Sequence, residues 1–263
     1  MFRLERDGHV GWVVMDWAGG LNTMAPEFFG ELRELFHRLG RDEQLRVVVV
    51  RGSERAFSAG LDLLQAQGLV KDLSAAGRRR LGEMIVEWQQ AMDAVAECSL
   101  PVIAAVTGAC LGGGLDLACA CDIRLCSRDA VFSVRETRMA MVADLGSLQR
   151  LRWIVGEGWA RHMVLSGADF SAEQALGMGL VTGVYDSAQE LWKAAGALAA
   201  QIAANSPLAV QGAKEVMNFS REFGDRAGLK YVAWRNAALL PSNDLMEALQ
   251  AFSQRRAPRF TGS

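Results

Sequence analysis

Apolar and polar positions along the first half of the chain follow strand and helix periods in turn. Residues 9–16 alternate between the two kinds, which predicts a strand. Residues 26–39 begin with a proline and repeat apolar side chains at helical spacing, which predicts an amphipathic helix. Residues 46–51 and 101–106 are nearly continuous apolar runs, typical of strands buried on both faces. The order of these segments indicates a repeating β-β-α architecture of the α/β class.

The final third of the chain has the pattern of successive helices. Residues 188–205 form a long alanine-rich segment, and Pro207 and Pro241 punctuate the segments that follow. This stretch contains no linker-like sequence. We therefore expect only a subdomain boundary near residue 200, with an α/β core carrying the active site over residues 1–200 and a helical region over residues 201–263.

Composition narrows the class of protein. With 51% hydrophobic and 22% charged residues among 263, the chain is typical of a globular protein with a sizeable core. The net charge of −2 provides no basic field, so nucleic acid is not an expected partner. No apolar run approaches the ~18 residues of a membrane span, so no membrane partner is expected either.

The cysteines and histidines exclude several chemistries. Five cysteines is an odd number, and their spacings fit neither a zinc ribbon nor a disulfide framework, so we expect buried free thiols and no metal. The three histidines have no obvious nucleophile beside them, which disfavours histidine-based hydrolysis. The N-terminus lacks a signal sequence and the C-terminus lacks a Ser-Lys-Leu address, so we expect a cytoplasmic protein.

The strongest chemical signal lies between residues 101 and 151. Three glycines, Gly112, Gly113 and Gly114, follow a buried strand and precede a small apolar segment that predicts a helix. Backbone N–H groups at such a turn have no partner inside the helix and would stabilise an oxyanion. A glycine triplet alone is weak support, since most are tight turns.

Three carboxylates in apolar surroundings accompany the glycine turn. They are Asp116, Glu136 and Asp144. Each also has a structural interpretation: Asp116 as a helix N-terminal acid, Glu136 as a surface partner of Arg135 or Arg138, and Asp144 as an N-cap. Taken one position at a time, the sequence leaves these alternatives open.

Four segments together resemble the crotonase (enoyl-CoA hydratase/isomerase) superfamily. They are residues 56–62 (AFSAGLD), 112–117 (GGGLDL), 121–124 (CDIR) and 148–151 (LQRL). The resemblance implies a crotonase-like ββα spiral core with a helical C-terminal region that covers the site and mediates subunit contacts. The three acids at these intervals are most similar to those of delta-3,5-delta-2,4-dienoyl-CoA isomerases. Hydratases of the family have Glu in place of Asp116 and a Pro-Gly-Ala-Gly-Gly-like loop around Asp144.

The resemblance also implies a set of site residues. The N–H groups of Ala59 and Gly113 would form an oxyanion hole, and Asp116, Glu136 and Asp144 would be catalytic. The residues implied in substrate binding are Ser58, Gly60, Leu61, Asp62 and Gly114. The substrate would be an acyl-CoA thioester with no separate cofactor, and the assembly a homotrimer or a homohexamer made of two trimers. Arg138 stands where the isomerases carry an acid, and we expect it to face solvent or another subunit.

The expected reaction converts a 3,5-dienoyl-CoA into a 2,4-dienoyl-CoA. The enolate oxygen needs stabilisation while a proton leaves C2 and another arrives at C6. We expect Asp144 to act at C2 and Glu136 at C6, with Asp116 tuning the pair or holding a water. One alternative is an enoyl-CoA hydratase in which Asp116 and Glu136 activate water and Asp144 is dispensable. The other is a non-catalytic acyl-CoA-binding homologue.

Overall fold

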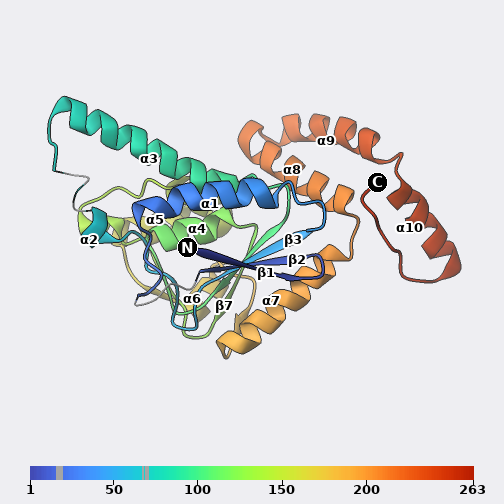
Figure 1. The fold of residues 1–263 in the computed structure, drawn as a ribbon, viewed down its shortest axis with the longest axis horizontal. Helices are drawn as coiled ribbons and strands as arrows, with labels where there is room; N and C mark the ends of the chain where they lie inside the picture. The colour runs from blue at the N-terminus through green and yellow to red at the C-terminus, as the bar shows by residue number, and fades with distance from the viewer. Residues whose placement is uncertain (16–19, 67, 69–70) are drawn as a thin grey trace.

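The computed structural model describes residues 1–15, 20–66, 68 and 71–263 (Figure 1). The strands are β1 (Phe2–Asp7), β2 (Val10–Met15), β3 (Val47–Arg51), β4 (Ala56–Ser58), β5 (Val102–Val106), β6 (Ala109–Leu111), β7 (Ile123–Ser127), β8 (Val131–Ser133), β9 (Phe170–Ser171) and β10 (Val184–Tyr185). The helices are α1 (Pro26–Leu39), α2 (Leu63–Ala66), α3 (Ala75–Ala96), α4 (Gly113–Ala120), the 3₁₀ helix η1 (Glu136–Met139), α5 (Ser147–Ser166), α6 (Ala172–Gly177), α7 (Ala188–Ala203), α8 (Pro207–Phe223), α9 (Asp225–Leu239) and α10 (Asn243–Gln254). The strand predicted over residues 9–16 is β2 as far as Met15, and Asp16 lies outside the described residues.

Two sheets share these strands. The larger sheet has the order β1-β2-β3-β5-β7-β10, and the smaller has the order β4-β6-β8-β9. Three successive strand pairs, β3 with β4, β5 with β6 and β7 with β8, each give their first strand to the larger sheet and their second to the smaller. The strands from these pairs run parallel to one another within each sheet, and helices follow each pair. The chain therefore winds as the predicted repeated ββα spiral.

The central strands are buried on both faces, as their continuous apolar sequences predicted. In β3, Val48 and Val50 pack into the core that also contains the apolar faces of α1 and α3. Val47 and Val49 point the other way, into a second cluster with Leu191 and other α7 residues. Fully burying a side chain of this size stabilises the fold by about 1.5–3 kcal/mol. The sheet is thus a rigid platform for the loops that leave it.

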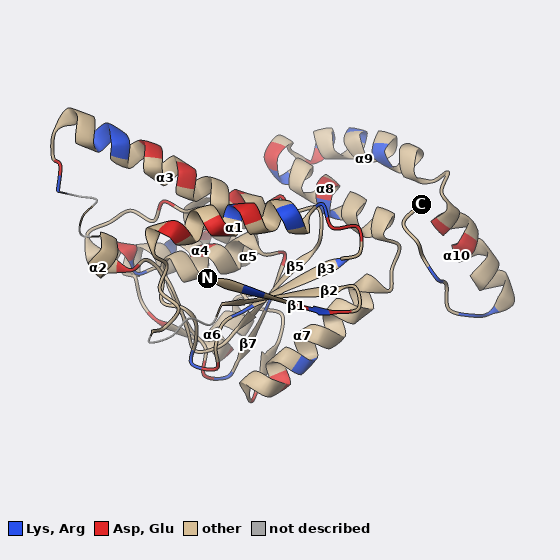
Figure 2. Ribbon diagram, in the orientation of Figure 1, with Lys and Arg blue, Asp and Glu red and all other residues tan. Residues whose placement is uncertain are grey.

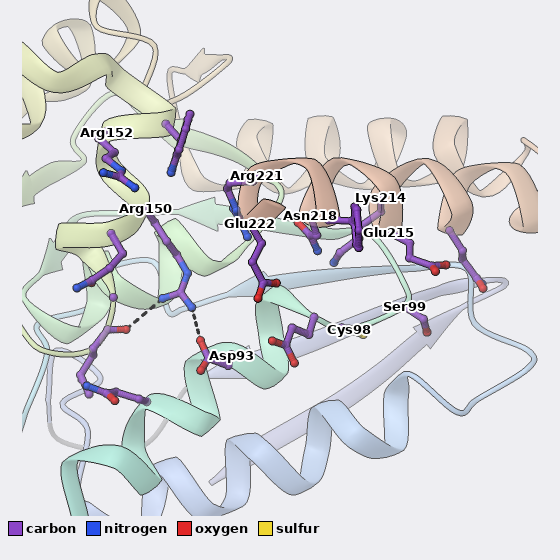
Figure 3. Close-up of a pocket in the computed structure, with 18 of the residues that line it drawn as sticks. Asp93, Cys98, Ser99, Arg150, Arg152, Lys214, Glu215, Asn218, Arg221 and Glu222 are labelled. Atoms are coloured by element: carbon purple, nitrogen blue, oxygen red, sulfur yellow. Dashed lines mark hydrogen bonds and ion pairs between the residues drawn. The ribbon is translucent and has the colours of Figure 1, made fainter. Parts of the chain in front are cut away.

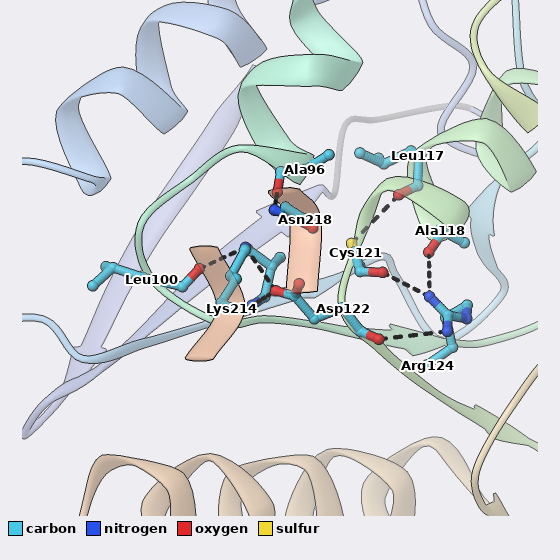
Figure 4. Close-up of polar contacts among 10 residues, drawn as sticks. Ala96, Leu100, Leu117, Ala118, Cys121, Asp122, Arg124, Lys214 and Asn218 are labelled. Carbon is cyan, nitrogen blue, oxygen red and sulfur yellow. Dashed lines mark hydrogen bonds and ion pairs between the residues drawn. The ribbon is translucent and has the colours of Figure 1, made fainter. Parts of the chain in front are cut away.

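The C-terminal helices α8, α9 and α10 lie beyond α7 at one end of the molecule (Figure 1). The buried ammonium of Lys214 on α8 donates to Asp122 Oδ2 at 2.7 Å and to the Leu100 carbonyl at 3.0 Å (Figure 4). Asn218 Nδ2 donates to the Ala96 carbonyl at 3.1 Å in the same anchor. These contacts fasten α8 to the core. The domain boundary near residue 200 stays a prediction. Helix α7, which packs on the sheet, continues across that position and ends at Ala203.

Acidic and basic residues are interspersed along the helices and do not gather on one face (Figure 2). No helix within residues 1–15, 20–66, 68 and 71–263 is long and apolar enough to cross a membrane.

Candidate active site

The glycine turn that opens α4 has the conformation its sequence predicted. Gly112 has φ +51°, a region that residues with a side chain rarely adopt. A Cβ on Gly114 would lie 2.3 Å from the Ser58 carbonyl oxygen, so only glycine lets the two loops approach this closely. The N–H of Gly113, the first residue of α4, has no hydrogen-bond acceptor in the described part of the chain. It is therefore available to a ligand.

The prediction that the N–H of Ala59 is the second oxyanion donor is wrong. This N–H donates to the Leu21 carbonyl at 2.8 Å and is not free to bind a thioester. The N–H of Gly60 is also occupied, because it donates to Ser58 Oγ at 3.1 Å. The loop therefore uses both of these donors to hold its own shape.

The N–H of Leu61, in the same loop, has no hydrogen-bond acceptor among the described residues. A parallel bridge joins Leu61 to Met24 through two hydrogen bonds, from Met24 N–H to the Gly60 carbonyl and from Asp62 N–H to the Met24 carbonyl. In such a bridge the N–H of Leu61 points away from Met24, and no described residue accepts it. Gly60 lies against the glycine turn, since a Cβ built on it would lie 3.0 Å from Gly113 N. The two unpaired N–H groups, from Leu61 and Gly113, thus belong to neighbouring loops that contact each other.

Asp116 is the most buried of the three acids. It lies in α4 with 1% of its surface exposed, and its Oδ1 accepts the N–H of Ser147 at 2.5 Å. Burial, reinforced by the negative charge of Glu136, raises the pKa of Asp116 to about 7. Its Oδ2 is buried without a partner among the described residues. Asp116 lies in the first turn of α4, as the alternative interpretation expected, and it also accepts the N–H of the first residue of α5.

Glu136 lies over the glycine turn. It begins η1, and its Oε1 lies 2.9 Å from the position of a Cβ on Gly112. Burial raises the pKa of Glu136, and the negative charge of Asp144 raises it further. The surface pairing considered for Glu136 is not observed, because Arg135 and Arg138 pair with Asp169 instead. The expectation that Arg138 faces outward is confirmed by its exposed side chain.

Asp144 is the exposed member of the trio. It lies in the irregular segment before α5, whose N-cap is Gly146, so Asp144 is not the N-cap. Nearby protein atoms still displace enough water to raise its pKa. Because Glu136 interacts with both Asp116 and Asp144, the three carboxyl groups form an electrostatically connected row with Glu136 in the middle.

A groove of about 900 Å³ opens beside Asp144, between α3, the start of α5, and α8 with α9 (Figure 3). Its walls are strongly charged, and it includes Arg150 and Lys214. Of the three acids, only Asp144 borders it. Burial and the unpaired donors, rather than this groove, define the candidate site.

Several residues that the sequence suggested for substrate binding form the framework of the site. Ser58 is fully buried, and its hydroxyl donates to the Asn22 carbonyl at 2.6 Å. Gly114 is buried against Ser58, the last residue of β4. Ser58 and Gly114 therefore have a structural role, and substrate contact by these two residues stays a prediction. Asp62 caps α2 by accepting the N–H groups of the second and third helical residues at 3.0 and 3.1 Å. Substrate contact by Gly60, Leu61 and Asp62 stays a prediction.

The sequence interpretation missed three contributors to the site. They are the Leu61 N–H, the Ser147 N–H that binds Asp116, and the Arg150 side chain, which reaches from α5 to the Leu145 carbonyl. The last two lie 31 and 5 residues from their partners, and no periodic pattern in the chain signals either contact. The side-chain amide of Asn22 donates to the backbone carbonyls of Met15 and Ala56 at 2.8 and 2.9 Å.

Comparison with known proteins defines the class. The family model described as enoyl-CoA hydratase/isomerase matches residues 5–263. The chain therefore belongs to the enoyl-CoA hydratase/isomerase family, as the four sequence segments indicated.

Individual relatives show which members of that family the chain is similar to. A mitochondrial delta(3,5)-delta(2,4)-dienoyl-CoA isomerase of Dictyostelium discoideum is 41% identical over 91% of this chain and 83% of its own. A peroxisomal enzyme of the same name from Arabidopsis thaliana is 39% identical over 99% of this chain and 95% of its own. Among solved structures, an enoyl-CoA hydratase from Bacillus anthracis superimposes with a TM-score of 0.91 at 30% identity, covering 100% of this chain and 99% of its own.

Proposed function

We propose that this protein is an isomerase that converts a 3,5-dienoyl-CoA into the 2,4-dienoyl-CoA. The observation that carries the proposal is the row of Asp116, Glu136 and Asp144 beside two unpaired backbone N–H groups. A hydratase needs two acids around one water, whereas a proton shift across the diene needs acid/base groups at two separated carbons. The identity to relatives named dienoyl-CoA isomerases supports the same reaction.

The N–H groups of Leu61 and Gly113 bind the thioester oxygen. As a proton leaves C2, negative charge develops on that oxygen, and each preorganised donor lowers the barrier by about 3 kcal/mol. These donors belong to two loops that contact each other, which supports binding of one oxygen atom by both. The fold supplies this stabilisation from its own backbone, so the reaction needs no cofactor, and CoA is part of the substrate.

The carboxylate of Asp144 takes the proton from C2, and the electron pair moves through the enolate towards C6. The carboxyl group of Glu136 then gives its proton to C6, which leaves double bonds at C2 and C4. Burial raises the pKa of both groups, and Asp144 has the more exposed side chain, so we assign the ionised form to Asp144 and the protonated form to Glu136. Asp116, whose pKa is raised to about 7 by burial and by the charge of Glu136, tunes the pair electrostatically.

The test is an ultraviolet assay of the purified protein with a 3,5-dienoyl-CoA, following the conjugated product. Asp144→Asn and Glu136→Gln should each lower kcat by about 10²-fold or more, as expected when a proton-transfer group is lost. Asp169→Asn, an exposed acid paired with Arg135, is the matched control and should retain activity. In deuterated water the product should carry deuterium at C6.

Two results would contradict the proposal. Hydration of a 2-enoyl-CoA that survives Asp144→Asn, without diene isomerisation, would identify a hydratase that uses Asp116 and Glu136. Tight binding of CoA esters without turnover of either substrate would identify a non-catalytic homologue.

We propose a homotrimer, or a hexamer of two trimers, as the assembly. The C-terminal helices expose large apolar side chains that a partner subunit would cover, namely Met217, Phe223, Leu229, Trp234, Met246, Leu249 and Phe252. Light scattering coupled to size-exclusion chromatography tests this, and a monomeric mass would contradict it.

We also propose a cytoplasmic location, because buried free thiols fit a reducing compartment. The relatives compared are named mitochondrial and peroxisomal. Cell fractionation distinguishes the three locations.

A further inference from the structure

The segment that presents Asp144 has no regular secondary structure to hold it. Residues 141–146 lie between η1 and α5, outside any helix or strand. Asp144 itself is exposed, so packing alone does not fix the position of its carboxylate. A base that must reach one carbon atom needs other restraints, since a misplacement of about 1 Å can cost about 10²-fold in rate.

Polar contacts from three directions supply those restraints. Gln89 Nε2 on α3 donates to the Asp144 carbonyl at 2.7 Å. Arg150 Nη1 on α5 donates to the Leu145 carbonyl at 3.2 Å. The N–H of Ser147 donates to Asp116 at 2.5 Å. Asp144 and Leu145 of the segment are thus held from α3 and α5, and Ser147, which directly follows the segment, is held from α4.

Arg150 is the centre of this arrangement. Its side chain is only 12% exposed, and its Nη2 pairs with Asp93 Oδ1 on α3 at 2.5 Å (Figure 3). The guanidinium also lies against Gly146, where a Cβ would be 1.8 Å from Nη1. One planar group therefore joins the Asp144 segment to α3 through two of its nitrogens. The single ammonium of a lysine does not offer this fork geometry.

We propose that Arg150 is a positioning residue for Asp144, with Asp93 orienting the guanidinium. The kinetic part of this proposal rests on the proposed function, because that function makes Asp144 the group that transfers a proton. Its structural consequence, restraint of residues 141–146, does not depend on which reaction is catalysed.

The test compares Arg150→Met and Arg150→Lys with Arg152→Met. Arg152 lies on the same helix and borders the same groove, but its guanidinium lies over the Trp153 ring at 5.0 Å. We expect Arg150→Met to lower kcat by about 10²-fold with KM within about 3-fold. Arg150→Lys should recover only a small part of the loss, and Arg152→Met should stay within about 2-fold of wild type. In Arg150→Ala, added guanidinium ion at low, non-denaturing concentration should restore part of kcat, a rescue that a merely destabilised fold would not show.

Hydrogen exchange provides a readout that does not involve turnover. Backbone amides of residues 141–147 should exchange about 10-fold faster in Arg150→Met than in Arg152→Met or wild type. Equal exchange in these proteins, or equal kcat in the two methionine variants, would overturn the positioning role. If the wild type itself fails to isomerise the dienoyl-CoA, the proposed function fails, and the exchange comparison still decides the role of Arg150.

Discussion

Asp116 makes the stability of the fold depend on pH in a direction that can be calculated. Its pKa rises from 3.8 to about 7 on folding, so the folded protein favours the protonated carboxyl. A group whose pKa is raised in the folded state contributes stability that is fully present below the unfolded pKa and is lost as pH rises through the folded one. The contribution of Asp116 should therefore disappear between about pH 4 and pH 7.

The size of the effect follows from the shift. A rise of about 3 pKa units corresponds to about 4 kcal/mol at 1.36 kcal/mol per unit. Glu136 is coupled to Asp116, so part of this free energy belongs to the pair, and we expect about 2–4 kcal/mol. Asp116→Asn cannot ionise. Its free energy of unfolding, relative to wild type, should therefore rise by this amount between about pH 4 and pH 8.

The assay is equilibrium urea unfolding followed by circular dichroism at a fixed protein concentration across this pH range. Using one concentration keeps any contribution from subunit association the same in both proteins. Asp169→Asn, which alters an exposed acid, controls for the change in net charge. A difference between wild type and Asp116→Asn that stays constant with pH would refute the reasoning, because it would mean that Asp116 ionises in the folded protein as readily as in the unfolded one.

Three further predictions test the framework. Gly114→Ala places a Cβ 2.3 Å from the Ser58 carbonyl oxygen and should lower both the thermal midpoint and the activity. Gly82→Ala, in α3, has open space around its Cβ and should raise stability by up to about 1 kcal/mol. Scanning fluorimetry measures the change in thermal midpoint of both variants. Lys214→Met leaves Asp122 without its ion-pair partner and should cost about 3 kcal/mol in urea unfolding, with part regained in the double variant with Asp122→Asn. The five buried thiols should not react with a thiol reagent until urea unfolds the chain, because burial raises the pKa of Cys119 and Cys121 to about 12.

Local sequence was sufficient for the elements whose boundaries depend on local chemistry. The helix predicted over residues 26–39 is α1, because its proline fixes the first turn and its apolar stripe meets the sheet. The runs at residues 46–51 and 101–106 are β3 and β5 within one residue at each end, because continuous β-branched sequence has few alternatives to a strand buried on both faces. The three acids were also found from sequence, since their spacing carried the family likeness.

Only one of the two donors of the candidate oxyanion hole could be predicted from the sequence. Gly113 follows from the sequence, because the first N–H of any helix lacks an internal partner. The choice between Ala59 and Leu61 depends on how residues 59–62 pair with Leu21 and Met24, almost 40 residues earlier. A shift of one residue in such a bridge reverses which N–H groups point to the partner. A sequence motif does not contain that register, so the structure was needed to choose Leu61.

The burial of the three acids completes the argument for their roles. A carboxyl group that donates a proton near neutral pH must resist ionisation, and one that accepts a proton must not. Glu136 is partly buried, and its pKa is raised by burial and by the charge of Asp144, whereas Asp144 is more exposed and borders the groove. If the roles were reversed, Glu136, the more buried of the two, would have to carry the charge at the start of the reaction beside Asp144. This order of burial supports the proposed direction of proton transfer, from C2 to Asp144 and from Glu136 to C6, and the spacing of the acids in the sequence does not reveal it.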